Sequence, residues 1–244
     1  MIPLQTRNTG LVEEMDKSSI DQDTLFRTYD QFHGLNRWLT GWKTLFKQRI
    51  LPLSGIDRPL RILDIGCGGG DLCRNLSEWA KHASIGVDIT GIDPDPRAIR
   101  YSRSQPLPDN VRFLHCRATD LVHNEETFDV ALSNHLLHHL EDFELITLCR
   151  EAEKLTTGTV LFNDIRRSRT GYLLFGAIAP LLFRNSFIVR DGLTSIRRSF
   201  RLDELKKALP KGWDVELLFP WRLLVTWSGR NRTGSTRIKP YGSP

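Results

Sequence analysis

A glycine-rich loop constrains this chain more than any other feature. The loop spans Asp64 to Gly70 (DIGCGGG) and follows an apolar run, Arg61 to Ile65, with the length of a buried strand. Leu72, Leu76 and Trp79 then recur at helical spacing. Glycines at a strand–loop–helix junction let the backbone approach a ligand closely. In a doubly wound sheet this junction lies at the carboxyl edge of the strands, where ligands bind.

Strands and helices alternate through the middle of the chain. The sequence predicts strands over 61–65, 87–93, 111–116, 128–134, 159–164, 213–219 and 222–227. It predicts helices over 72–80, 96–104, 143–155 and 202–209. Near-continuous apolar strands that alternate with helices are typical of a parallel sheet covered on both faces. We therefore expect an α/β fold.

The 244 residues suit one domain with additions. Residues 1–20 are polar and aperiodic, so we expect a loose N-terminal arm. Residues 21–55 are helical in pattern, with breaks expected at Gly34 and Gly41, and would form a lid. The main domain is expected over 56–227, with a helical cap inserted at 165–201, and a flexible basic tail over 228–244.

Composition limits which compartment and which partners are expected for the protein. The four cysteines lack the paired spacing of a zinc site, so we expect a reducing compartment and no metal. No signal peptide is evident, and the uncharged run from Gly171 to Phe183 is shorter than a membrane span. A cytoplasmic protein is expected, with peripheral membrane contact left open through 165–201. Residues 151–244 carry 17 Lys and Arg against 8 Asp and Glu, which favours an anionic partner. The sequence does not predict an oligomeric state.

Two nucleotide cofactors compete for the glycine loop. A dinucleotide fingerprint needs a sixth-place glycine, but those places hold Asp71 or Cys73, depending on the starting glycine. The other candidate is S-adenosylmethionine, and the dinucleotide alternative fails on spacing. Asp93 ends the second predicted strand, where a carboxylate accepts ribose hydroxyls.

These motifs resemble those of the class I S-adenosylmethionine-dependent methyltransferases. Asp64 to Gly70 is similar to their D-x-G-x-G-x-G loop, and Ile92-Asp93-Pro94 to their second-strand acid. Residues 128–130 with 137–140 look like their fourth-strand segment. The resemblance implies a Rossmann-like, doubly wound sheet of seven strands with the last one antiparallel. It also implies S-adenosyl-L-methionine as cofactor and S-adenosyl-L-homocysteine as product.

The resemblance carries over a set of cofactor contacts. Many members place an acid after the third strand, but this chain has Arg117-Ala118 there, so Thr119 or Asp120 would substitute. The cofactor-binding residues that the resemblance implies are Asp64, Gly66, Cys67, Gly68, Gly70, Asp93, Pro94, Ala118, Thr119, Asp120, Asn134 and His135.

The acceptor is expected to be a small molecule. The fourth strand ends without the Pro-Pro-aromatic motif of base methylases, and no Pro-Cys pair exists, so nucleic acid is disfavoured. A hydroxyl acceptor, especially a phenol, calls for a base, and histidine is the natural one. His138 or His139 would serve, oriented by Asp164 at the end of the fifth strand. The alternative is that these histidines only pack or cap a helix.

The cap is both apolar and arginine-rich. This composition suits a hydrophobic acceptor or delivery from a membrane surface, and equally a buried helix with solvated arginines. Residues 191–198, with Asn36-Arg37 upstream, resemble a bacterial subgroup grouped with ubiquinone-type quinol methylases. We therefore predict O-methylation of a small or lipid-like phenolic, quinol or polyketide-type acceptor, with substrate contacts at Tyr29, Arg37, Tyr172 and Phe175. The alternatives are N- or C-methylation of another small molecule, an RNA methyltransferase, or a non-catalytic module that binds the cofactor.

Overall fold

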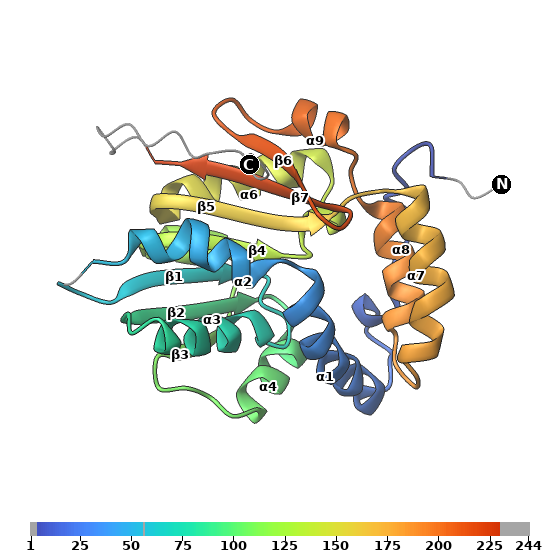
Figure 1. The fold of residues 1–244 in the computed structure, drawn as a ribbon, viewed down its shortest axis with the longest axis horizontal. Coiled ribbons are helices and arrows are strands. Elements are labelled where there is room, and N and C mark those ends of the chain that lie inside the picture. The colour runs from blue at the N-terminus through green and yellow to red at the C-terminus, as the bar shows by residue number, and fades with distance from the viewer. Residues whose placement is uncertain (1–3, 56, 230–244) are drawn as a thin grey trace.

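A single seven-stranded sheet organises the molecule (Figure 1). The computed structural model describes residues 4–55 and 57–229. The strand order is β3-β2-β1-β4-β5-β7-β6, and β7 alone runs antiparallel to its neighbours β5 and β6. This confirms the expected Rossmann-like sheet. The strands are β1 (Leu60–Ile65), β2 (Val87–Asp93), β3 (Val111–His115), β4 (Phe128–Asn134), β5 (Thr156–Ile165), β6 (Asp214–Leu218) and β7 (Arg222–Ser228).

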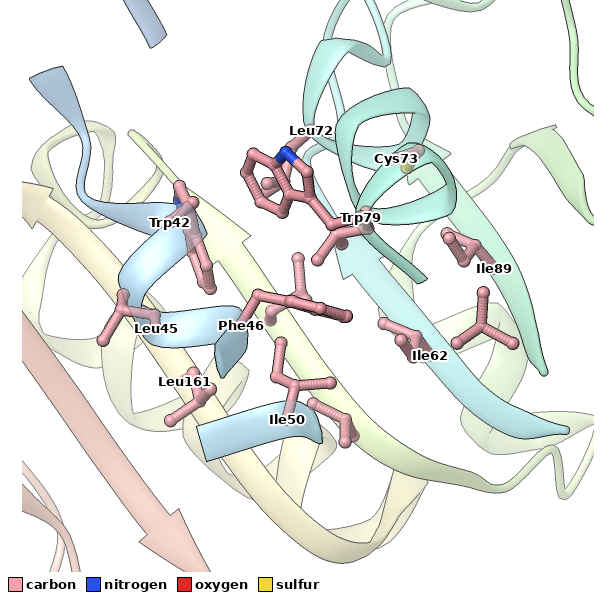
Figure 2. Close-up of a cluster of buried hydrophobic side chains, with 14 of the residues drawn as sticks. Trp42, Leu45, Phe46, Ile50, Ile62, Leu72, Cys73, Trp79, Ile89 and Leu161 are labelled. Carbon is pink, nitrogen blue, oxygen red and sulfur yellow. The ribbon is translucent and has the colours of Figure 1, made fainter. Parts of the chain in front are cut away.

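Helices cover both faces of the sheet and its carboxyl edge (Figure 1). They are α1 (Gln22–Leu39), α2 (Trp42–Leu45), α3 (Asp71–His82), α4 (Pro96–Ser104), α5 (Ala118–His123), α6 (Asp142–Leu155), α7 (Arg169–Leu182), α8 (Ile188–Arg198) and α9 (Leu202–Ala208). On one face, α2 and α3 pack over β1, β4 and β5, with Trp42 and Phe46 close to Trp79 (Figure 2). The other face is covered by α5, α6 and α9.

The parallel strands all end at one edge, beside α1, α7 and α8 (Figure 1). Asn134 of β4 is opposite Asn163 of β5 in the register, which places the ends of the central strands side by side. Because the loops that follow these strands hold most of the predicted site residues, the fold gathers them at this edge. No helix among the described residues is long and apolar enough to cross a membrane.

The predicted strands and helices match the observed ones within a few residues, with two differences. Helix α1 continues through Gly34, so the break expected there is wrong, whereas Gly41 does end it with a left-handed φ of 72°. The short helix α5 was not expected, because six residues are too few to show a period. The tail over 228–244 lies outside the described residues, apart from Ser228 and Gly229.

The expectation of a loose arm over 1–20 is wrong for residues 4–20, which lie against the body of the protein. Arg7 donates to the carbonyl oxygens of Arg198 at 2.6 Å and of Leu140 at 2.5 Å. Glu13 is only 3% exposed. The Asp191 carboxylate of α8 accepts backbone N–H groups from the arm at 2.7 and 3.1 Å. The arm is irregular but docked, because its polar groups find partners in the cap.

Candidate active site

One cavity of ≈ 840 Å³ opens at the carboxyl edge of the sheet. Its walls are the glycine loop, α1, the N-terminal arm, the ends of β4 and β5, the start of β7, and the two cap helices α7 and α8. The cavity therefore joins the two parts that the sequence expected to bind cofactor and acceptor.

The glycine loop is held in place by backbone hydrogen bonds. Gly66 and Gly68 have left-handed φ values of 72° and 51°, which glycine adopts without strain. The N–H groups of Gly66 and Cys67 both donate to the Ile92 carbonyl, at 2.8 and 2.9 Å. Gly68 donates to Asp93 Oδ2 at 2.9 Å. The loop and the second-strand acid therefore form one unit.

Asp64 is a buried acid with an open acceptor. Its side chain is 1% exposed, and Oδ1 has no hydrogen-bond partner among the described residues. Burial raises the pKa of Asp64 to about 8. Asn36 Oδ1 also lacks a partner, while Asn36 Nδ2 donates to Asp71 at 3.1 Å. Buried acceptors without partners are costly, so a ligand that carries an ammonium group would satisfy them.

Two further acids complete this end of the cavity. Asp93 and Asp95 line it together with Pro94, and burial raises the pKa of Asp93. Each Asp93 oxygen accepts one backbone N–H, from Gly68 and from Asp95, which leaves lone pairs for a ligand hydroxyl.

Four of the expected cofactor contacts do not line the cavity. A Cβ on Gly70 would lie 2.3 Å from the Phe113 ring, so this glycine is needed for packing. Asp120 accepts from the Arg117 N–H and caps α5, and Thr119 donates to Glu151. Ala118 is buried in the core. In this structure Gly70, Ala118, Thr119 and Asp120 have roles in packing and capping, and their contacts with the cofactor stay predictions.

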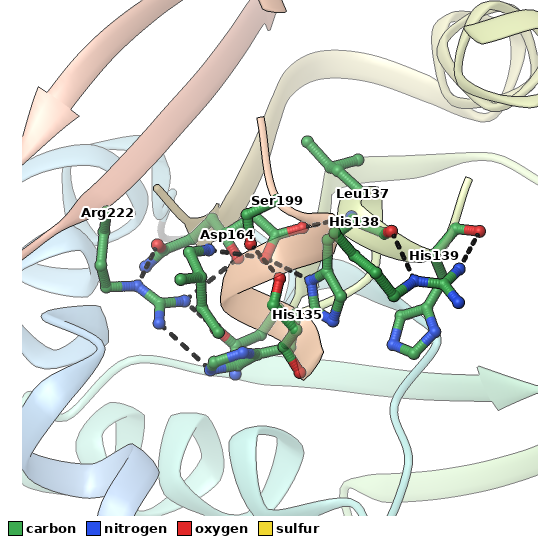
Figure 3. A network of polar contacts seen from close by, with 12 residues as sticks. His135, Leu137, His138, His139, Asp164, Ser199 and Arg222 are labelled. Carbon is green, nitrogen blue, oxygen red and sulfur yellow. Dashed lines mark hydrogen bonds and ion pairs between the residues drawn. The ribbon is translucent and has the colours of Figure 1, made fainter. Parts of the chain in front are cut away.

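His138 lies between the carboxylates of Glu13 and Asp164, and Figure 3 shows its contact with Asp164. Its Nδ1 is 2.7 Å from Asp164 Oδ1, its backbone N–H donates to Asp164 Oδ2, and its Nε2 is 3.3 Å from Glu13 Oε1. Burial alone would lower the pKa of His138, but the charge of Asp164 and the hydrogen bonds to both acids raise it to about 9. At this pKa the protonated form of His138 predominates at neutral pH, so the imidazole would have to lose that proton before it could act as a base. Asp164 contacts His138 as expected, and the role of His138 as base stays a prediction.

His139 is more open, with 26% of its side chain exposed. Its Nδ1 is 3.2 Å from Asp16 and its Nε2 is 3.8 Å from Glu13. Glu13, His138 and His139 thus bring their ligand-type atoms within 4.8 Å of one another. The ion pairs account for this grouping, because the histidine nitrogens already face acids. His139 as a base stays a prediction.

Arg222 occupies the end of the cavity beside β4 and β5 (Figure 3). It donates to Asn163 Oδ1 at 2.7 Å and to Asn134 Oδ1 at 2.9 Å. His135, which has a left-handed φ of 63°, places Nε2 at 3.1 Å from Arg222 Nη1. Burial and the Arg222 charge hold the pKa of His135 well below its usual value, so this imidazole is neutral. Asn134 and His135 line the cavity as expected.

The cap supplies an apolar wall. Phe175 and Tyr29 line the cavity as expected, whereas Tyr172 does not, and the Arg37 side chain lies outside the described residues. The other apolar side chains of this wall are Leu174, Ile178, Leu182, Phe183, Ile188, Ile196 and Trp221.

Sequence reasoning missed several lining residues. Glu13 and Asp16 belong to an aperiodic arm that gave no signal, and Asn36 was noted only as part of the subgroup resemblance, without a predicted role in the site. Arg222 did leave a signal, because it is a charge at the start of an otherwise apolar strand, RLLVTW.

Comparisons with known proteins agree with this geometry. Residues 62–157 match a family model described as a methyltransferase domain. Among solved structures, the plantazolicin methyltransferase BpumL in complex with SAH superposes with a TM-score of 0.57 at 14% identity, over 86% of this chain and 95% of that one. Human N-acetylserotonin methyltransferase in complex with SAM superposes with a TM-score of 0.59 at 11% identity, over 86% and 56%. The chain therefore contains a methyltransferase domain over residues 62–157 and shares its fold with these methyltransferases.

Two curated relatives have names that state a particular activity. It is 34% identical over 156 residues to a ubiquinone biosynthesis O-methyltransferase of Mesorhizobium japonicum, covering 62% of this chain and 57% of that protein. It is 29% identical over 169 residues to the protein of the same name from Cereibacter sphaeroides, covering 64% of each. The chain thus spans less than two thirds of the length of these relatives.

Proposed function

We propose that the protein is an S-adenosylmethionine-dependent methyltransferase that O-methylates a hydrophobic phenol or quinol. One observation carries this proposal: a single cavity joins the glycine loop and its acids to the apolar wall of the cap. N- or C-methylation of another small molecule is the second candidate, since it would use the same cofactor residues.

The residues of the acidic end fit the cofactor. Asp93 would accept the ribose hydroxyls, and the open oxygens of Asp64 and Asn36 would accept the ammonium group of the methionine portion. When bound, the cofactor supplies an activated methyl group on a sulfonium. The protein then has to position the acceptor, exclude water and control the proton of the acceptor hydroxyl. The cap and the arm cover the cavity and serve the first two tasks.

The choice of oxygen and of a quinol-type acceptor rests on the relatives named ubiquinone biosynthesis O-methyltransferase. The apolar wall from Leu174 to Phe183 agrees with it, because an aromatic or lipid-like acceptor gains free energy by burying its surface there.

We further propose that α7 contacts a membrane surface and admits the acceptor from it. Leu181 and Leu182 are 74% and 67% exposed, on a helix without internal charge. Leu174, Ile178 and Leu182 are exposed and also line the cavity, so the apolar wall reaches the surface. Three arginines at the ends of the cap helices α7 and α8 would face anionic headgroups: Arg169, Arg184 and Arg190.

Calorimetry with S-adenosylhomocysteine tests the cofactor. We expect binding, and we expect Asp93→Ala to lose roughly 1.5–3 kcal/mol of it, as a charged hydrogen-bonding group does. Asp88→Ala is the matched control, since Asp88 is an exposed acid on the same strand β2. Unchanged affinity in Asp93→Ala would remove Asp93 from the site. NADH binding without S-adenosylhomocysteine binding would overturn the proposed function.

Transfer of a labelled methyl group tests the acceptor class. Simple catechols, hydroquinones and long-chain quinols should accept it on oxygen, and arylamines and RNA should not. Transfer to nitrogen or carbon would favour the second candidate. Cofactor binding without transfer to any of these would favour the non-catalytic module.

A further inference from the structure

The cavity has two ends of opposite charge. The end formed by the glycine loop and β2 carries the acids Asp64, Asp71, Asp93 and Asp95. The end formed by β5, β7 and the cap carries the arginines Arg166, Arg198 and Arg222. None of these three arginines has a carboxylate within 4 Å among the residues that the structure describes. These arginines therefore have no direct acid partner among the described residues.

Arg222 is the most buried of the three, at 5% exposure. A guanidinium has five N–H donors, and four of those of Arg222 have partners, all of them neutral: Asn163 Oδ1, the Asn163 carbonyl, Asn134 Oδ1 and His135 Nε2. The fifth donor, on Nη1, has no partner among the described residues. Burial lowers the pKa of Arg222 to about 10, so it is still a cation at neutral pH.

The groups around Arg222 do not neutralise it. Asp164 on β5 is the nearest acid, but both of its oxygens bind His138, which carries its own positive charge. His135 accepts from Arg222 at Nε2, so its proton sits on Nδ1 and the ring is neutral. Glu13 on the arm is held by His138 and by Ser195. A buried cation without an acid partner is costly, and an anionic ligand would compensate it.

We propose that this end of the cavity binds the acceptor with its hydroxyl ionised, and that Arg222 is the residue that stabilises the resulting phenolate. This inference rests on the proposed function and assigns the acceptor to hydroxyls of phenolic acidity. The hydroxyl releases its proton to solvent on binding. In the transfer, an electron pair of the oxygen forms the new C–O bond, and the pair of the broken C–S bond stays on sulfur. No protein base has to take a proton in that step.

With this charge arrangement, transfer does not require a protein base. A phenol has a pKa near 10, so a shift of about two to three pKa units ionises it at neutral pH. Such a shift is within reach of a nearby buried cation, whereas an aliphatic alcohol titrates far too high. In this inference, positioning and charge take the place of the general base that the sequence predicted at His138 or His139.

The test is the ionisation of a bound chromophoric phenol. 4-Nitrophenol is titrated by absorption in the complex of the full chain with S-adenosylhomocysteine, where no transfer occurs. We expect the pKa of the bound probe to lie at least one unit below its value in water. Arg222→Gln should raise it by one unit or more, and Arg222→Lys should raise it less. Arg150→Gln, at an exposed arginine of α6, is the control and should leave it unchanged.

Several outcomes overturn the inference. They are a wild-type probe pKa at or above its value in water, an unchanged shift in a folded Arg222→Gln, and failure of the probe to bind. Because the first of these needs no variant, misfolding of Arg222→Gln does not weaken the test. Displacement of the phenol by benzoate without any pKa shift would mean that Arg222 binds a carboxylate substituent instead. If the wild-type chain does not bind S-adenosylhomocysteine, the proposed function is contradicted. If it binds S-adenosylhomocysteine but leaves the pKa of the bound probe unshifted, only this inference is contradicted.

Discussion

His138 shows that the position of a residue can be predicted from a sequence while its charge cannot. Its place after the fourth strand and its contact with Asp164 followed from the order of the motifs. Its second acid, Glu13, comes from 125 residues away, and the two carboxylates together raise the pKa of His138 and favour the imidazolium form.

The His138 ion pairs should make stability depend on pH. The pKa of His138 is raised to about 9, from an ordinary value near 6.5, so its contribution is complete below pH 6.5 and is lost as the pH rises through about 9. The pKa values of Glu13 and Asp164 are lowered, so their contributions are lost as the pH falls below about 4. Melting temperatures from pH 5 to 10 should show the alkaline decline.

His138→Gln should flatten this decline between about pH 6.5 and 9. The comparison with the variant is needed because Asp64, with its pKa raised to about 8, also weakens folding as it ionises at rising pH. An equally steep decline in His138→Gln would show that His138 is not charged in the folded protein.

His139 is the more exposed of the two candidate bases. Its substitution separates catalysis by a protein base from transfer to an acceptor that is already ionised. A positioned base contributes about 10²–10⁴-fold to turnover. We expect His139→Gln to retain turnover within about tenfold, because ionisation by Arg222 makes a base unnecessary. Steady-state kinetics on an accepted quinol measure this. A drop of about a hundredfold with unchanged S-adenosylhomocysteine affinity would restore His139 as the base.

At the scale of elements, the sequence predicted well those strands and loops whose signals lie in neighbouring residues. The strands over 87–93 and 128–134 were predicted to the residue, because apolar runs next to glycine and proline turns are encoded nearby. The glycine loop and Asp93 were found for the same reason. The arm was not, because its anchors to Asp191 and His138 join segments 125–177 residues apart without any periodicity. Arg222 was missed because its neutral partners, Asn134, His135 and Asn163, lie 59–88 residues away along the chain.

One carboxylate of α8 accepts two backbone hydrogen bonds from the N-terminal arm. Asp191 is 1% exposed and accepts the N–H groups of Glu14 and Met15. Asp191→Ala leaves both donors unpaired, at a cost of about 1–3 kcal/mol each when buried, so the arm should detach. Limited proteolysis should then cleave within residues 4–20 faster than in the wild type.

Arg190→Gln is the control for the arm. Arg190 is 77% exposed and pairs with Glu14, and exposed ion pairs contribute little, so cleavage should stay at the wild-type rate. Equal protection in Asp191→Ala would mean that other contacts, such as those of Arg7, suffice to hold the arm.

At the scale of the molecule, the basic part of the chain is also the part that exposes the apolar face of α7. Residues 1–150 carry 17 Lys and Arg against 21 Asp and Glu, while residues 151–244 carry 17 against 8. The basic part contains the cap, and the cap exposes the apolar face of α7. An apolar helix face with arginines at its ends matches an anionic bilayer surface, where headgroups meet the charges and acyl chains meet the leucines.

Vesicle sedimentation checks the membrane proposal. The protein should bind vesicles that contain phosphatidylglycerol, more weakly at high salt, and should not bind pure phosphatidylcholine. Replacing Leu181 and Leu182 by serine should abolish binding, because these side chains are 74% and 67% exposed and would enter the acyl region. Phe143→Ser removes a side chain that is also exposed, at 69%, but lies on α6, which packs on the sheet, so binding should persist. Equal loss in both variants would mean that exposed apolar area in general, and not α7, drives the association. Binding that survives the α7 substitutions would leave the arginines alone as the contact, and the acceptor would then have to enter the cavity from water.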